Sequence, residues 1–131
     1  MKITGNVIDL KDNEVFVFGS NLSGRHGAGA AKQALKWGAK WGEGVGFYGK
    51  TYAIPTVNAT ITGKLSISKI NNYVQDFIKF AKDHPELHFL VTAVGCGLAG
   101  WTSNDIAPLF LEATVLENVS LPREFWKVLN Q

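Results

Sequence analysis

Two glycine-rich segments have the residue types best suited to binding a ligand in this chain of 131 residues. The first is Gly27-Ala28-Gly29-Ala30, and the second is Gly95-Cys96-Gly97-Leu98-Ala99-Gly100. Glycine lets the backbone approach a ligand closely or adopt a positive φ. A helix N-terminus adds free amides and the positive end of a dipole, which suits a phosphate. Either segment alone fits close packing of a helix on a sheet, but together they predict a site for a phosphate or diphosphate.

Side chains beside these segments supply further candidate groups. Near the first segment, Asn21 fits a bond to a ribose hydroxyl or a role in holding its loop, and Arg25 fits a phosphate. His26 carries an imidazole suited to proton transfer near neutral pH, although support of the loop is the commoner role. Near the second segment, Trp101 fits stacking on a base or sugar, or a place in the core. Asp105 is either a helix-start carboxylate or a general base.

Composition sets limits on the class of protein. Apolar residues make up 46% of the chain and charged residues 18%, which favours a packed core over a disordered chain. The single cysteine, Cys96, excludes an intrachain disulfide and a thiolate zinc cluster, and it is expected to be a small buried thiol. A net charge of +2 without a basic stripe predicts no nucleic-acid partner.

Strand and helix patterns alternate along the first part of the chain. An apolar run at 14–18 predicts a buried strand, and a looser alternation over 2–10 predicts an edge strand before it. Apolar residues at helical spacing predict a helix that starts near Ala28 and stops near Gly38. The glycines between 42 and 49 follow this helix and predict a flexible turn or lid.

The same alternation continues to the end of the chain. We predict a strand at 51–54 ended by Pro55, a helix at 67–81 opened by Ser66 or Ser68, a strand at 87–94, a helix at 106–116, a strand at 118–121 and a short helix at 123–129. The start of the 106–116 helix is ambiguous. Thr102 with Asp105 resembles a capping box, whereas Pro108 favours a cap at Asn104 or Asp105.

This order of elements predicts one domain over residues 1–131. Alternating strands and helices favour a three-layer α/β/α sandwich with a mixed, largely parallel central sheet. In such sheets, ligands bind beyond the carboxyl ends of the strands. Both glycine-rich segments follow a predicted strand and precede a predicted helix, so we expect them to meet at one edge of the sheet.

The two segments, in this order, resemble those of the macrodomains, the ADP-ribose-binding α/β family, and the similarity covers about residues 3–119. It is closest to the small branch with the terminal ADP-ribose protein glycohydrolase and ADP-ribose-1″-phosphate phosphatase. There, Gly-Ala-Gly-Ile-Ala opens the first helix, as 27–31 does here, and a strand ends in Gly-Cys-Gly-Leu, as at 95–98 here. The resemblance implies that both loops hold the diphosphate and distal ribose near Asn21. It also implies that Asn6 replaces an adenine-binding aspartate, with its amide oxygen accepting from the adenine amino group.

The catalytic positions of that branch are not matched. The glycohydrolase has an aspartate after Gly-Cys-Gly-Leu, where this chain has Ala99. The catalytic lysine of the glycohydrolase would fall near residues 55–57, which include no lysine. Other macrodomain hydrolases have an aspartate after the glycine segment, and this chain has Ala31 at that position. The resemblance therefore implies the fold and the ligand class more directly than it implies a reaction.

The sequence thus predicts a protein that binds ADP-ribose or an ADP-ribosyl group, and it leaves three functions open. One is hydrolysis at the distal ribose, with His26 or Asp105 moving the proton. Another is a non-catalytic reader of ADP-ribosylated protein, and the third is a phosphatase or hydrolase for another phosphorylated nucleotide or sugar. No motif requires a metal or a cofactor. Without a signal peptide or an apolar run of about 18 residues, we expect a cytoplasmic protein with no membrane partner.

Overall fold

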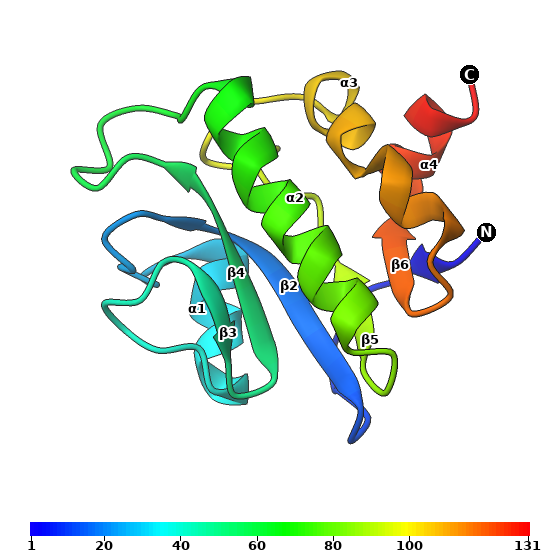
Figure 1. The fold of residues 1–131 in the computed structure, drawn as a ribbon. Coiled ribbons are helices and arrows are strands. Elements are labelled where there is room, and N and C mark those ends of the chain that lie inside the picture. The colour runs from blue at the N-terminus through cyan, green and yellow to red at the C-terminus, as the bar shows by residue number, and fades with distance from the viewer.

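A computed structural model describes residues 1–131 and has six strands and four α-helices (Figure 1). In chain order the elements are β1 (Ile3–Thr4), β2 (Glu14–Asn21), α1 (Gly29–Ala34), β3 (Gly46–Tyr48), β4 (Thr51–Val57), α2 (Ile67–Asp83), β5 (His88–Val91), α3 (Ser103–Ile106), β6 (Val119–Pro122) and α4 (Arg123–Leu129). Two 3₁₀ segments, η1 (Leu35–Trp37) and η2 (Ala107–Val115), continue α1 and α3. The predicted α/β class with a mixed sheet is confirmed.

The sheet is mostly parallel, and its strand order brings the two glycine-rich segments together. The order is β1-β6-β5-β2-β4-β3, and every neighbouring pair is parallel except β3 with β4. β5 lies directly beside β2, in a register that pairs Val17 with Val91. Because carboxyl ends of parallel strands meet at one edge, the loops after β2 and β5 leave the sheet side by side.

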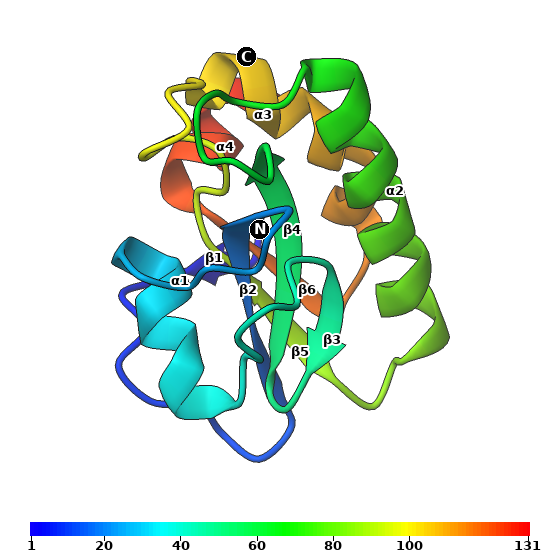
Figure 2. The same ribbon diagram turned by 90° about the vertical axis from the view of Figure 1, so that its left-hand side faces the viewer.

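Helices cover the two faces of the sheet unequally (Figure 2). Along β2, Val15 and Val17 belong to the larger core, which is filled mainly by α2, α4 and η2. Phe16 and Phe18 point the other way, into a small cluster with three alanines from α1 and the turn after it. Because successive side chains of a strand alternate between faces, this one apolar run contributes to both cores.

Helix α2 has the features that its sequence predicts. It is the longest helix, with 17 residues, and its buried residues repeat at helical spacing. The Ser66 hydroxyl accepts a hydrogen bond from the Lys69 amide at 3.2 Å, so Ser66 and not Ser68 is the N-cap. The helix ends at Asp83, and His84, the residue before Pro85, is its C-cap. None of the helices is both long enough and apolar enough to cross a bilayer.

Several strand predictions and one turn prediction were wrong in extent; the strand predicted at 14–18, for example, continues to Asn21 as β2. Pro55 does not end β4, which continues to Val57; β3 stops pairing at Ala53, and a proline is tolerated where a strand has a free edge. The segment predicted as a flexible turn contains β3 at 46–48. The edge strand is reduced to β1, at 3–4, and the strand at 87–94 is reduced to β5.

The helices after both glycine-rich segments are shorter than their periodicity predicts. α1 has six residues and tightens to a 3₁₀ segment before Gly38, which is left-handed with φ of 102°. Thr102 is the N-cap of α3 in a capping box with Asp105, so the alternative caps are wrong. Pro108 is accommodated because the helix has become 3₁₀ by Ala107, and the proline lies in the first turn of that segment.

Candidate functional site

A cavity of about 680 Å³ opens at the carboxyl edge of β2, β4 and β5. It is lined by Gly19, Ser20, Asn21, Arg25, Gly27, Ala28, Gly29, Ala30, Ala31, Trp41, Thr56, Val57, Ile61, Thr92, Ala93, Val94, Gly95, Gly97, Leu98 and Ala99. Both glycine-rich segments therefore border one space, as their positions after neighbouring strands predict. The volume is within the usual range for a small-molecule site, about 300–1,000 Å³.

Both glycine-rich segments have free backbone amides where they border the cavity. The N–H groups of Gly27 and Ala28 have no acceptor within the protein, and neither have those of Gly97, Leu98 and Ala99. No side chain caps the first turn of α1. Because an exposed amide without a partner readily donates a hydrogen bond to an anion or a carbonyl oxygen, this cavity wall suits a phosphate.

Asn21 organises the first loop from within. Its Oδ1 accepts hydrogen bonds from the Arg25 amide and the Ser23 hydroxyl, both at 2.9 Å, and its Nδ2 donates to the Arg25 carbonyl at 2.9 Å. Oδ1 has both lone pairs engaged, and only one Nδ2 hydrogen is left for a ligand. The geometry therefore favours the loop-holding alternative over the ribose-binding one.

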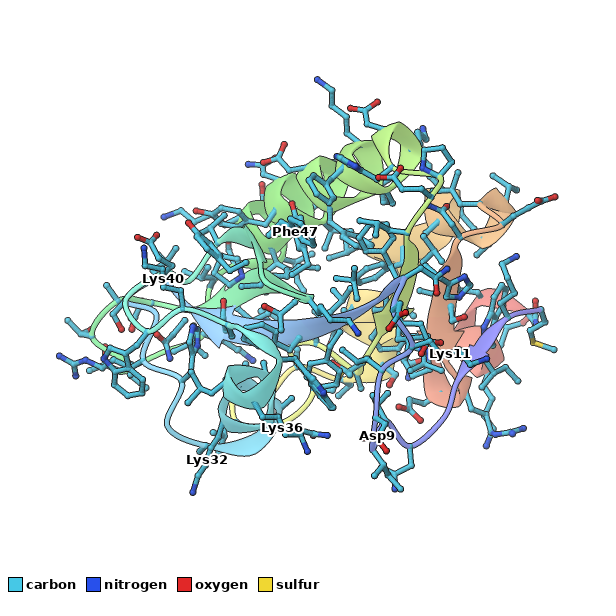
Figure 3. The ribbon with its side chains drawn as sticks, turned by 90° about the horizontal axis from the view of Figure 1, so that it is seen from below. Asp9, Lys11, Lys32, Lys36, Lys40 and Phe47 are labelled. Atoms are coloured by element: carbon cyan, nitrogen blue, oxygen red, sulfur yellow. The ribbon has the colours of Figure 1, made fainter.

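Basic side chains lie on α1, on the loop before it and on the segment after it. Arg25 is the only ionisable side chain that lines the cavity, and it is exposed. Lys32, Lys36 and Lys40 project outward from α1 and the segment after it (Figure 3), and none of them pairs with an acidic side chain. Arg25 is the basic group placed to attract an anionic ligand into the cavity.

A second hollow adjoins the first at the end of β5. It has a volume of about 350 Å³ and is lined by Ile3, Thr4, Gly5, Asn6, Thr92, Ala93, Pro122, Arg123 and Glu124. Thr92 and Ala93 border both hollows. Asn6 lines only the smaller hollow, where the Thr4 hydroxyl is buried and has no hydrogen-bond partner. An elongated ligand can extend from one hollow to the other past the end of β5.

His26 lies behind the cavity wall. Its side chain is fully buried and is not among the cavity-lining groups. Nε2 lies 3.0 Å from the Lys40 carbonyl oxygen and 3.1 Å from the Glu43 carbonyl oxygen, so Nε2 carries the proton and donates to both. This imidazole connects two loops and does not reach the cavity surface, so we assign it no proton transfer in this arrangement.

Asp105 is also engaged within the fold. Its Oδ2 accepts from the Thr102 amide at 3.0 Å and from the Thr102 hydroxyl at 2.8 Å. These two hydrogen bonds lower the pKa of the Asp105 carboxyl below its ordinary value. A carboxylate with a lowered pKa is a weaker base, and Asp105 does not line the cavity. The structure therefore supports the helix-start alternative.

Three other predicted ligand residues lie outside the cavity lining. Cys96 is half-buried, and burial raises the pKa of its thiol above the ordinary value, which opposes a nucleophilic role. Gly100 lies beyond the lining residues of its segment. The Trp101 indole donates to the Leu65 carbonyl at 3.0 Å, and the Lys64 ammonium lies 3.7 Å from the centre of its ring. Trp101 therefore packs at the edge of the larger core and not in the cavity.

Sequence reasoning missed part of the cavity wall. Trp41 and Ile61 come from loops without a recognisable motif, and Thr56, Val57 and Thr92 come from strand ends. The strand-end residues could have been predicted, because the carboxyl ends of β4 and β5 lie on either side of the carboxyl end of β2 in the parallel sheet. No such signal existed for the two loop residues.

No group of three or more His, Cys, Asp or Glu side chains is close enough to bind a metal ion. Comparison of the chain with protein-family models, with curated proteins and with solved structures finds no match.

Proposed function

We propose that this protein is a compact three-layer macrodomain-like domain that binds ADP-ribose, or an ADP-ribosyl group on a protein, as a non-catalytic reader. The observation that carries the proposal is the single cavity between the two glycine-rich segments, with free amides on both sides. A diphosphate in this space would accept hydrogen bonds from both segments, and Arg25 lines the same cavity and adds a positive charge to it.

The adjoining hollow supports an extended nucleotide rather than a free phosphate. Asn6 borders this hollow, and the resemblance to macrodomains puts an adenine-binding side chain at that position. With adenine there and the diphosphate between the loops, the distal ribose lies in the larger cavity. Thr92 and Ala93 would lie along the middle of such a ligand, because they border both hollows.

The reader assignment rests on the chemistry of the cavity wall. Apart from Arg25, the lining residues are glycines, apolar side chains, Ser20, two threonines and Asn21. None of these is an efficient acid or base at neutral pH, because an arginine stays protonated and hydroxyls and amides ionise far from this range. Without a positioned proton-transfer group, slow or absent hydrolysis is expected.

Calorimetric titration with ADP-ribose tests the ligand. We expect saturable binding, which Gly97→Asp weakens at least tenfold because its carboxylate would repel the diphosphate. A β-carbon at Gly97 meets no atom within 4 Å, so this variant should fold. Val115→Asp adds the same charge at a surface position that is 81% exposed and outside the cavity, and it should bind normally. A folded wild-type protein that gives no heat at high micromolar ADP-ribose would refute the proposal.

A turnover assay separates the reader from a hydrolase. ADP-ribosylated protein should be retained on a column of the immobilised domain and eluted by free ADP-ribose with its modification intact. Release of ADP-ribose during retention, at a rate above that of a column without the domain, would overturn the reader assignment but leave the ligand class standing.

A further inference from the structure

Trp41 is the only aromatic side chain that lines the cavity. It is 59% exposed, whereas the other three tryptophans are at least partly buried. An indole that is left in solvent at the wall of a cavity lacks the packing that usually stabilises so large an apolar group. It presents a flat apolar surface to whatever occupies the cavity.

The turn that carries Trp41 is held closely against the first glycine-rich loop. The Gly42 amide donates to the Gly24 carbonyl at 2.9 Å, and the Ser20 hydroxyl donates to the Gly44 carbonyl. The two backbones are in direct contact, because a β-carbon on Gly44 would lie 1.9 Å from the Asn21 carbonyl oxygen. This turn is therefore fixed relative to the loop that borders the cavity.

His26 completes the attachment directly behind Trp41. The two carbonyls to which its Nε2 donates belong to Lys40 and Glu43, which flank Trp41 and Gly42. The His26 ring also packs edge-to-face on the Trp41 ring, with centroids 6.3 Å apart, and on the Phe18 ring, with centroids 5.4 Å apart. The imidazole thus holds both the backbone and the indole of this turn.

The two hollows give the bound ligand a direction. Asn6 borders only the smaller hollow and Trp41 only the larger one, while Thr92 and Ala93 border both. Trp41 and Asn6 therefore belong to different hollows, which Thr92 and Ala93 separate. If the adenine of the proposed ligand occupies the hollow of Asn6, its distal ribose is the part that reaches Trp41.

We infer that Trp41 is a specificity-determining residue that packs on the distal ribose end of the ligand, and that His26 is the positioning residue that holds it there. This inference rests on the proposed function. It explains how the protein would distinguish ADP-ribose from ADP, since ADP has no group that reaches the indole. It also gives His26 a role that its full burial permits.

The test is titration of wild-type protein and variants with ADP-ribose and with ADP, together with tryptophan emission. Burying the apolar surface of an indole against a sugar is worth about tenfold in affinity. We expect Trp41→Ala to weaken ADP-ribose binding about tenfold and to leave ADP binding unchanged. ADP-ribose should change the emission of wild-type protein and of Trp37→Phe, a matched control whose ring packs on Phe16 away from the cavity, but not that of Trp41→Phe.

Variants of His26 test the positioning role. His26→Ala should weaken ADP-ribose binding as Trp41→Ala does and spare ADP binding, whereas His26→Gln should recover part of the loss because its amide can donate to the same carbonyls. Thermal unfolding checks that each variant is folded. If His26→Ala does not fold, Trp41→Ala by itself still tests the role of Trp41.

The possible failures are distinct. Absence of ADP-ribose binding by wild-type protein would refute the proposed function itself. Normal wild-type binding with an unchanged affinity in Trp41→Ala would overturn the role of Trp41 only. Normal affinity for ADP-ribose in both His26 variants, or an equal loss of affinity for ADP-ribose and for ADP, would overturn the positioning role of His26.

Discussion

Substitution of Gly44 by alanine tests the contact between the first glycine-rich loop and the turn that carries Trp41. The added β-carbon would lie 1.9 Å from the Asn21 carbonyl oxygen, whereas an ordinary contact needs at least 3.4 Å, so the two backbones must separate by about 1.5 Å. Such a displacement is incompatible with the 2.9 Å hydrogen bond from the Gly42 amide to the Gly24 carbonyl. The carbonyl of Gly44 would also lose its hydrogen bond from Ser20.

The magnitude follows from these two effects. Overpacking of this kind costs about 1–3 kcal/mol, and each hydrogen bond lost from a buried site costs about 1 kcal/mol. We therefore expect Gly44→Ala to lower the free energy of unfolding by about 3–5 kcal/mol. It should also weaken ADP-ribose binding, because Trp41 moves with the turn.

Urea denaturation followed by circular dichroism measures this change, with Gly27→Ala as the matched control. Gly27 has an ordinary φ, and a β-carbon there meets nothing within 4 Å, so its unfolding free energy should change by less than about 1 kcal/mol. A Gly44→Ala protein as stable as the Gly27→Ala protein would refute the close backbone contact, and with it the fixed position of Trp41.

Two further predictions concern ionisable groups near the second glycine-rich segment. Burial raises the pKa of the Cys96 thiol, so iodoacetamide at pH 7.5 should alkylate it more slowly than it alkylates a free cysteine peptide. The two rates should become equal only after the protein is denatured in urea. A native protein that reacts as fast as the peptide would contradict the burial of Cys96. Hydrogen bonds from Thr102 lower the pKa of Asp105 below its ordinary 3.8, so its stabilising effect is complete above that pH and is lost as the pH falls through the lowered value. Asp105→Asn should therefore reduce the melting temperature at pH 7 more than at pH 2.5, and an equal reduction at both pH values would contradict the capping box.

Sequence patterns predicted the α/β class, helix α2 and the meeting of the two glycine-rich segments. These features depend on local signals: Ser66 before a long amphipathic run, and apolar runs that end in glycine. The meeting of the segments needs only the rule that carboxyl ends of parallel strands share an edge. No knowledge of side-chain packing was required, and the cavity between 27–30 and 95–99 is therefore predictable from sequence.

Only the tertiary structure decided which side chains reach that cavity. His26 stands between two cavity-lining residues in the sequence, yet its ring turns inward because the carbonyls of Lys40 and Glu43 and the ring of Phe18 surround it there. Trp41 reaches the cavity because two stretches of backbone more than ten residues apart pack at glycines. Such contacts have no periodicity and no motif, since they depend on the shape of both loops at once. Sequence alone therefore left two roles open for His26 and gave no sign that Trp41 lines the cavity.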